Sequence, residues 1–205
     1  MHKVGVLVSG RGSNLQAIMD RIADGYLPLE IAVVISDKPD AFALERAQKA
    51  DIKAVAVERK ACASKEEFEA KINAALEAEG CELVVLAGFM RILSADFVNK
   101  WQHKIINIHP ALLPSFTGAH AIDDAFARGV KVTGVTVHFA NEIYDNGPIV
   151  AQRALAVEEG WDVDTLEEHL HAIEHVLYPE VVQMLADGRV HVLENGKVAI
   201  DAPRG

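Results

Sequence analysis

An amide and an imidazole stand two residues apart at the end of an apolar run, in the stretch KIINIHPALLP. Because the side chains of a strand alternate between its faces, Asn107 and His109 are expected on the same face. Pro110 has no backbone N–H to give to a sheet, so the strand should end there. Open α/β sheets bind ligands at the carboxyl ends of their strands, which makes the pair a candidate catalytic site. A core histidine bonded to a neighbouring loop is the structural alternative.

A carboxylate follows much later, in the turn NEIYDNGPIV. Asp145 in such a turn usually caps its own backbone. If it reached the imidazole of His109, it would fix the orientation of the ring and favour its protonated form. The sequence supplies no distance between them, so both interpretations stand.

The stretch SGRGSN lies between an apolar run and a helical pattern and could bind an anion. Its glycines allow a sharp turn in which successive backbone N–H groups and a helix N-terminus face one ligand, typically a phosphate. A dinucleotide fingerprint would need a glycine in place of Leu15, although Asp37 after the next apolar run keeps a nicotinamide interpretation open. No GK[ST] follows, which excludes a nucleotide P-loop. A plain tight turn is the structural alternative.

The remaining histidines carry weaker signals. His169, His171 and His175 share one predicted helix, and the last two have the i,i+4 spacing of metal ligands. The helix is acidic and has no HExxH motif, so we interpret this as a solvated face and predict no metal. His138 is interpreted as a strand residue with a local partner, and Ser9 belongs to no GxSxG elbow.

The elements that must position these groups alternate through residues 1–88, where short apolar runs are separated by stretches of helical periodicity. This order predicts a doubly wound α/β fold with a mostly parallel sheet. Gly25 and Gly80 follow helical stretches as left-handed caps, and Ser64 with Glu67 forms a capping-box pattern. The pattern loosens over residues 89–101.

The second half of the chain predicts an antiparallel C-terminal extension of the sheet. Two strand-like runs follow each other after one short helix, and a long helix over residues 164–187 contains Pro179, which predicts a kink or a break. Asn195-Gly196 between two short alternating runs predicts a hairpin. The expected elements are a strand at 104–109, a helix at 120–129 and strands at 132–140 and 147–157.

Composition limits the class of protein. A chain of 205 residues suits one domain, and a formal charge of −10 argues against nucleic acid and membrane as partners. Neither a membrane-length apolar run nor a cleavage signal is present, so a cytoplasmic location is expected. Cys62 and Cys81 lie in no zinc or CxxC spacing and are expected to be reduced thiols.

Four separated motifs, SGRGSN, LVVLAGFMRIL, INIHPALLP and YDNGPIVAQ, resemble in order and spacing those of the phosphoribosylglycinamide formyltransferase family, the folate-dependent enzymes of purine synthesis. The resemblance covers nearly all of the chain. It implies a single Rossmann-like formyltransferase domain over residues 1–205, with a phosphate- and substrate-binding N-terminal half and a folate-binding, catalytic C-terminal half. It also implies transfer of the formyl group of 10-formyltetrahydrofolate, as cosubstrate, to the amine of phosphoribosylglycinamide without a metal.

The resemblance also assigns residues. The catalytic trio is Asn107, His109 and Asp145. The substrate-binding residues are Gly12, Ser13, Asn14 and Glu174. The folate-binding residues are Lys65, Met90, Arg91, Ile92, Leu93, Asn107 and Asn141. The chain departs from the family pattern at Arg11, at Lys65 in place of an arginine, and in the loop SFTGAHA. A Lys at position 65 keeps the charge but loses the bidentate fork.

Other functions share parts of this pattern. Methionyl-tRNA formyltransferase and formyltetrahydrofolate deformylase are similar in their HPxLLP element, but each has an additional domain for which this chain has no room. Hydrolysis of formyltetrahydrofolate is the alternative reaction, and the anion-binding loop argues against it because water needs no phosphate site. A non-catalytic folate- or nucleotide-binding protein is the third hypothesis. A homodimer is compatible with all three.

Overall fold

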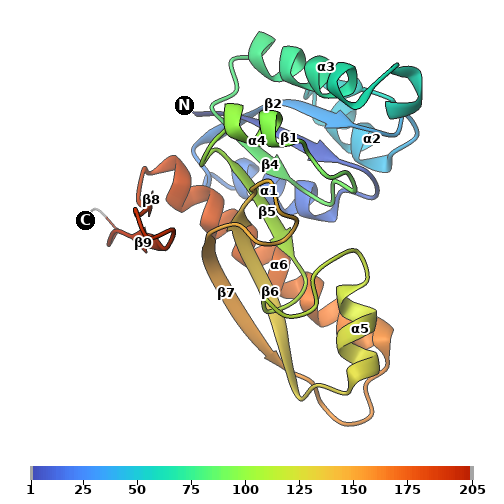
Figure 1. The fold of residues 1–205 in the computed structure, drawn as a ribbon, viewed down its shortest axis with the longest axis vertical. Coiled ribbons are helices and arrows are strands. Elements are labelled where there is room, and N and C mark those ends of the chain that lie inside the picture. The colour runs from blue at the N-terminus through green and yellow to red at the C-terminus, as the bar shows by residue number, and fades with distance from the viewer. Residues whose placement is uncertain (1, 204–205) are drawn as a thin grey trace. The chain divides into compact units, whose positions relative to one another are not determined.

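A computed structural model describes residues 2–203 of the chain. The chain divides into two compact units, Met1–Ile106 and Asn107–Gly205. The first is coloured blue to green and the second yellow-green to red in Figure 1. The boundary falls within strand β5, Ile105–His109.

Strands and helices alternate along the first unit. β1 pairs in parallel with β2 and β4, and β2 pairs in parallel with β3. Parallel neighbours need a crossover connection, which the intervening helices supply. In Figure 1, α3 lies on one side of these strands and α1 on the other. The elements are β1 (His2–Val8), α1 (Ser13–Ala23), β2 (Leu29–Ser36), α2 (Phe42–Lys49), β3 (Ala54–Ala56), the 3₁₀ turn η1 (Arg59–Ala61), α3 (Lys65–Ala78), β4 (Leu83–Leu86) and α4 (Ala95–Lys100).

The core of the first unit is centred on β1. From Val4 onward this strand is buried, as parallel strands covered on both faces are. Gly5 interrupts its aliphatic run because α3 packs closely there: a Cβ on Gly5 would lie 2.1 Å from Cδ2 of Leu76 and 3.2 Å from Sγ of Cys81. The missing side chain therefore sets the spacing between helix and strand.

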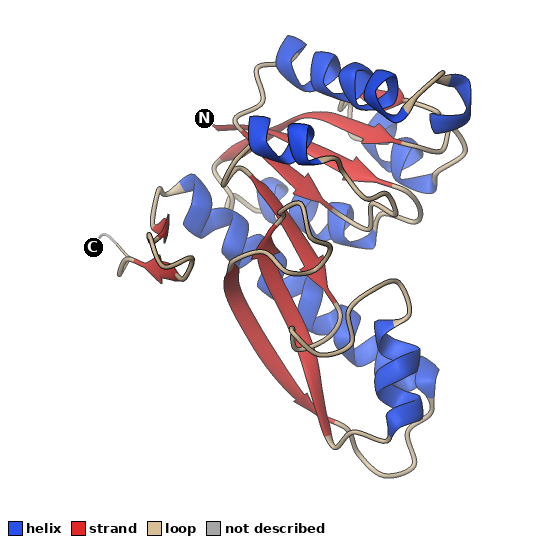
Figure 2. Cartoon of the chain, viewed as in Figure 1, coloured by secondary structure: helices blue, strands red, loops and turns tan. Residues whose placement is uncertain are grey.

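The second unit is built on an antiparallel pair. β6 (Val132–Phe139) pairs with β7 (Ile149–Ala156) from Val132 opposite Ala156 to His138 opposite Ile149, with a register shift after Val137. β6 is buried along almost its whole length, whereas every second residue of β7 is exposed from Gln152 onward. The helices are α5 (Ala121–Arg128) and α6 (Val163–Ala186), and a hairpin joins β8 (Val190–Val192) to β9 (Val198–Ile200). Figure 2 distinguishes these helices and strands by colour.

The strand order is β3-β2-β1-β4-β5-β6-β7, with β8 and β9 in a separate two-stranded sheet. The predicted fold class, a mostly parallel doubly wound α/β sheet with an antiparallel extension, is confirmed. Local predictions also hold: Gly25 and Gly80 have φ of 81° and 67°, and Ser64 caps α3 by accepting from the N–H of Glu67. Gly196 turns the predicted hairpin with φ 77°.

Two details differ from expectation. α4 forms in the stretch where the pattern loosened, and its N-terminus is capped by Ser94, whose hydroxyl accepts from the N–H of Phe97. α6 continues across Pro179, so the break that this residue would allow is absent. The helix is one continuous element of 24 residues that carries buried side chains on both sides of the proline.

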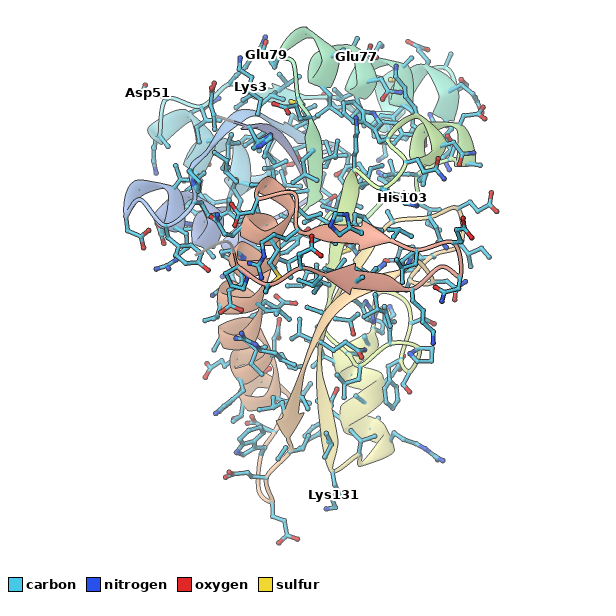
Figure 3. The ribbon with its side chains drawn as sticks, turned by 90° about the vertical axis from the view of Figure 1, so that its left-hand side faces the viewer. Lys3, Asp51, Glu77, Glu79, His103 and Lys131 are labelled. Carbon is cyan, nitrogen blue, oxygen red and sulfur yellow. The ribbon has the colours of Figure 1, made fainter. Side chains whose placement is uncertain are left out.

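Several ion pairs lie on the surface of the first unit. Figure 3 labels Glu77 and Glu79 near the end of α3, which pair with Lys100 and Lys53 at 2.6 Å each. Such exposed pairs contribute about 0–1 kcal/mol each and do not define the fold. Within residues 2–203, no helix combines the length and apolar character needed to cross a bilayer.

Candidate active site

The loop before α1 has the backbone geometry of an anion-binding nest. Gly12 is left-handed, with φ 73° and ψ 36°, and Ser13 begins the helix. A left-handed residue followed by a right-handed one turns consecutive N–H groups toward the same point. Among the described side chains none caps this helix, and its first turn carries no acid. The predicted residues Gly12, Ser13 and Asn14 therefore combine a helix N-terminus with a nest, which suits a phosphate.

Asp37 and Arg91 form an ion pair in the first unit. Nε of Arg91 lies 2.6 Å from Oδ2 of Asp37, whose side chain is 1% exposed. The acid that kept a nicotinamide interpretation open thus has an arginine as its partner. The other Asp37 oxygen, Oδ1, is buried with no hydrogen-bond partner among the described residues.

The remaining folate-binding candidates of the first unit fall into two kinds. Met90 and Ile92 are exposed apolar side chains, at 63% and 61%, whereas Leu93 is buried. Nζ of Lys65 lies 3.8 Å from Oε1 of Glu69 on the next turn of α3. A contiguous patch of exposed apolar side chains can mark a ligand site, whereas single exposed ones are ordinary.

In the second unit, the predicted catalytic trio forms one buried cluster. Nδ1 of His109 lies 3.5 Å from Oδ2 of Asp145, and both side chains are almost fully buried. A fourth residue joins them: Nε2 of His138 lies 3.2 Å from Nδ2 of Asn107 and 3.8 Å from Oδ1 of Asp145. Two residues of β5, one of β6 and one of the following turn thus converge.

Both ring nitrogens of His109 face oxygens that can only accept. Nε2 lies 2.7 Å from the carbonyl oxygen of Phe116, and Nδ1 faces the Asp145 carboxylate. Only an imidazole with a proton on each nitrogen offers a donor to both oxygens. Both nitrogens of this ring therefore have an oxygen as their neighbour.

His138 has the opposite character. Its Nδ1 lies 2.9 Å from the Phe139 carbonyl, to which it donates, so the neutral ring presents Nε2 as an acceptor to the amide of Asn107. Burial lowers the pKa of His138, while the Phe139 carbonyl and the Asp145 carboxylate act in the other direction. A neutral His138 fixes which end of the Asn107 amide faces it.

The backbone holds Asp145 in an unusual conformation. Its φ is 54°, and its Oδ2 accepts a hydrogen bond of 2.8 Å from the N–H of Gly118. Asp and Asn tolerate this left-handed region better than most residues. In the same turn Oδ1 of Asn141 accepts from the N–H of Ile143 at 3.1 Å. Asp145 therefore does not simply cap its own turn; it points to the histidine pair.

The long helix α6 carries the last predicted site residue. Glu174 is buried at 4% exposure, and its Oε2 lies 4.0 Å from Nε2 of His171. The rings of His171 and His175 are stacked with centroids 6.2 Å apart, and His169 stacks on Trp161 at 4.2 Å. The part of the chain that the structure describes contains no cluster of three or more metal-ligating His, Cys, Asp or Glu residues.

His138 is the residue that sequence reasoning did not assign to the site. Its strand is buried on both faces, and the alternation of Thr136 and His138 with Val135, Val137 and Phe139 was interpreted only as strand periodicity. The available signal was a histidine in an otherwise buried strand, since a buried polar group needs a partner.

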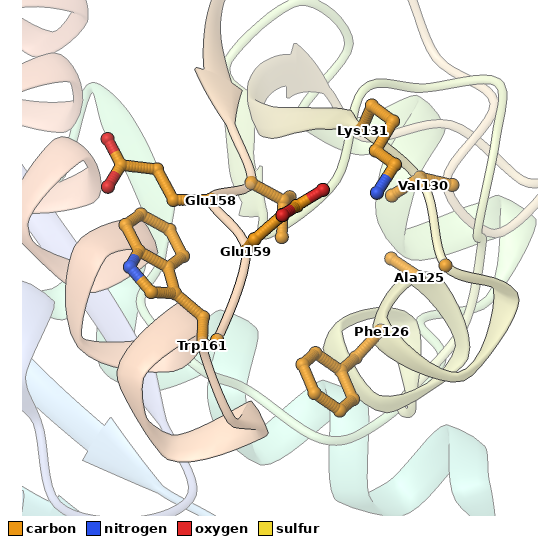
Figure 4. Close-up of a pocket in the computed structure, with 10 residues that line it drawn as sticks. Ala125, Phe126, Val130, Lys131, Glu158, Glu159 and Trp161 are labelled. Atoms are coloured by element: carbon orange, nitrogen blue, oxygen red, sulfur yellow. The ribbon is translucent and has the colours of Figure 1, made fainter.

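A separate cavity of about 300 Å³ occurs in the second unit. Figure 4 shows Trp161 and Phe126 on different sides of it, with Lys131 and Glu159 at its rim. None of the predicted site residues lines it.

A family model described as formyl transferase matches residues 2–182. The chain belongs to the formyl transferase family. A member of similar length is phosphoribosylglycinamide formyltransferase of Bacillus subtilis, which is 41% identical over 90% of this chain and 95% of that protein. The human trifunctional purine biosynthetic protein adenosine-3 is 44% identical over 96% of this chain, but the match spans only 19% of that protein.

Solved structures of the formyl transferase family agree with this fold. The crystal structure of glycinamide ribonucleotide transformylase 1 from Symbiobacterium toebii has a TM-score of 0.95 and 44% identity, covering 98% of this chain and 95% of that one. A formyltetrahydrofolate deformylase from Pseudomonas syringae is less similar in sequence, with 27% identity and a TM-score of 0.90 over 98% of this chain and 66% of that one.

Proposed function

We propose that this chain transfers the formyl group of 10-formyltetrahydrofolate to the amine of phosphoribosylglycinamide. The observation that carries the proposal is the buried cluster of Asn107, His109 and Asp145 in a chain of the formyl transferase family. The names of relatives that match along most of their length support the choice of acceptor.

The amine nitrogen attacks the formyl carbon, and the carbonyl oxygen becomes an oxyanion in the tetrahedral intermediate. Asn107 offers an amide N–H to this oxygen, and protonated His109 offers a charged donor. One preformed donor of this kind typically contributes about 10²–10³ in rate. For Nε2 of His109 to donate to the oxyanion, its bond of 2.7 Å to the Phe116 carbonyl must open.

The amine loses a proton as the intermediate forms, and the folate nitrogen gains one as it leaves. Asp145 is the proposed carrier of this proton, and it also balances the charge on His109. Oδ1 of Asp145 is buried and has no hydrogen-bond partner among the described residues. This oxygen can therefore accept a proton, which supports the role. The folate nitrogen becomes a good leaving group once protonated, so the proposal involves no metal.

Each substrate is assigned its own set of binding residues. The nest of Gly12, Ser13 and Asn14 binds the substrate phosphate, and Glu174 binds the glycinamide end. The folate contacts are assigned to Lys65, Asn141 and the segment Met90–Leu93, including Arg91, together with Asn107. Residues 1–205 are proposed to act as a single formyltransferase domain, in the cytoplasm, with small-molecule partners and without nucleic acid or membrane.

The first test measures products. Incubated with 10-formyltetrahydrofolate and phosphoribosylglycinamide, the protein should release tetrahydrofolate and give a formylated ribonucleotide, followed by absorbance and mass spectrometry. With the folate alone it should release no formate. Formate release without the amine would show the hydrolase instead, and binding of both ligands without turnover would show a non-catalytic protein.

The second test removes the proposed charged donor. His109→Ala should lower kcat by about 10²-fold or more, because the oxyanion loses its charged donor. His191→Ala, which removes an exposed histidine paired with Asp201, is the matched control and should not change kcat. Formyl transfer by His109→Ala within a few-fold of wild type would show that His109 is not catalytic.

A further inference from the structure

Helix α2 contacts Gly10, Arg11 and Gly12, which belong to the loop between β1 and α1 that we call the phosphate loop (residues 9–14). The N–H of Ala43 donates to the carbonyl of Gly10 at 3.1 Å, and Nε of Arg46 donates to the carbonyl of Arg11 at 2.9 Å. A Cβ on Gly12 would lie 2.7 Å from Cβ of Ala43. In Figure 1, α2 lies near the arrowheads of β1 and β2, where the loop to α1 begins.

These contacts determine where the loop N–H groups point. In a trans peptide the carbonyl and the next N–H point in opposite directions. With the carbonyls of Gly10 and Arg11 directed at α2, the N–H groups of Arg11 and Gly12 are turned away from it. The left-handed conformation of Gly12 continues this arrangement into the first turn of α1.

The guanidinium of Arg46 makes two directed hydrogen bonds at this place. Its Nη1 also donates to Oε1 of Gln16 on α1 at 2.8 Å, so one guanidinium joins the loop to the helix that follows it. The same group lies over the ring of Phe42, 4.8 Å from its centroid. A lysine could keep the charge at this position but not the two donors in a fixed fork.

We propose that Arg46 is a positioning residue for the phosphate loop: it holds the Arg11 carbonyl so that the loop N–H groups are preorganised for a ribose phosphate. This rests on the proposed function, because it names the acceptor phosphate as the ligand of that loop. Arg46 acts through the backbone of Arg11 rather than on the reacting atoms.

The test compares Arg46→Lys with wild type on two acceptors, phosphoribosylglycinamide and its phosphate-free analogue, ribosylglycinamide. Arg46→Lys should raise KM for the phosphorylated acceptor by about tenfold, an amount comparable to one lost charge-assisted hydrogen bond, with kcat within about twofold. The KM for formyl-folate and the kcat/KM for the phosphate-free acceptor should not change. Lys49→Ala, which removes an exposed cation from the same helix, is the matched control and should behave as wild type.

Unchanged KM in Arg46→Lys would overturn the proposal, and so would an equal loss with both acceptors, since that indicates a general effect on folding. If Arg46→Lys does not fold, Gln16→Ala, which removes the second acceptor of the fork, should raise KM in the same selective way. A wild-type KM in Gln16→Ala would then overturn the proposal.

A binding measurement separates this inference from the proposed function. Ribose 5-phosphate is titrated calorimetrically into wild type and Arg46→Lys, without any turnover. Weaker binding to the variant with no formyl transfer by wild type would support the role of Arg46 and reject the proposed reaction. Equal binding, or no binding to wild type, would reject the role of Arg46 whatever the activity.

Discussion

Asp145 has an imidazole within 4 Å of each of its carboxylate oxygens, and the two rings have different environments. His109 faces acceptors on both nitrogens, at Phe116 and Asp145, whereas His138 donates through Nδ1 to the Phe139 carbonyl and accepts through Nε2. One carboxylate thus lies between two rings whose hydrogen-bond partners differ. Of the two β5 side chains that were predicted to act in catalysis, His109 faces Asp145 and Asn107 faces His138.

Asp145→Asn isolates the charge of the carboxylate. Asn also tolerates a φ of 54°, so the backbone turn should be retained. The variant should lower kcat by about 10²–10⁴, because proton transfer loses its carrier, and its pH–rate profile should change shape. Steady-state kinetics from pH 5 to pH 9 checks both; an unchanged profile would remove the proposed role of Asp145.

His138 predicts a pH-dependent stability. Burial lowers its pKa in the folded chain below the usual value of about 6.5, so between these two values the unfolded chain binds a proton that the native chain does not. The free energy of unfolding should therefore fall as pH drops below about 6.5, with no contribution from His138 at higher pH.

His138→Gln provides the measurement, because glutamine is neutral at every pH. Urea unfolding of both proteins from pH 5 to pH 8 gives a difference in stability that also removes the contributions of the other eight histidines. The difference between wild type and variant should be constant above about pH 7 and should shift against wild type towards pH 5. A difference independent of pH throughout would contradict the assignment.

Residues differ in how far the sequence alone could place them. Asn107 and His109 could be paired because a strand has a two-residue period, which is a local property. The approach of Asp145 depends on a turn 36 positions further along the chain, and no local pattern encodes that distance. His138 shares a face of β6 with Thr136, which the two-residue period shows, but no local pattern indicates that this face meets Asn107 and Asp145.

At the scale of elements, the close approach of α3 to β1 depends on Gly5. Gly5→Ala would place a methyl carbon 2.1 Å from Cδ2 of the fully buried Leu76, and relief requires movement in a packed core. The free energy of unfolding should fall by about 1–3 kcal/mol with an unchanged urea m-value.

Gly10→Ala is the matched control for stability, since a Cβ there meets no atom within 4 Å. Its urea midpoint should lie close to that of wild type. Equal midpoints for Gly5→Ala and wild type would show that α3 can shift without loss and that the spacing is not set by this glycine.

The order of the elements could be predicted because each signal is local and they agree: apolar runs, helical periodicity and capping residues all indicate the same boundaries. α4 was missed because its six residues make fewer than two turns, too few for a period to emerge. α6 continues across Pro179, so the break did not form; Pro179 is buried together with Tyr178 and Val181, and such tertiary packing supplies most of the stability of a helix.

At the scale of the whole molecule, the formal charge of −10 makes polyanions unfavourable partners. The local positive potential of a helix N-terminus is confined to one turn and suits a single phosphate rather than a phosphate backbone. In a gel-shift experiment at physiological salt, the protein at about 10 µM should not retard duplex DNA. Retardation that weakens with added salt would contradict this and would indicate a nucleic-acid surface.

The two native thiols are both secluded in the first unit, and this affects how the protein can be studied. Burial raises the pKa of the Cys81 thiol to about 11, so at pH 8 only about one molecule in a thousand carries the reactive thiolate there. Cys62 is also buried. A single engineered cysteine at an exposed turn, for example Asn195→Cys, would then take up a maleimide dye ahead of both native thiols. Fluorescent reporters can therefore be attached to the wild-type background without first removing its own sulfur groups.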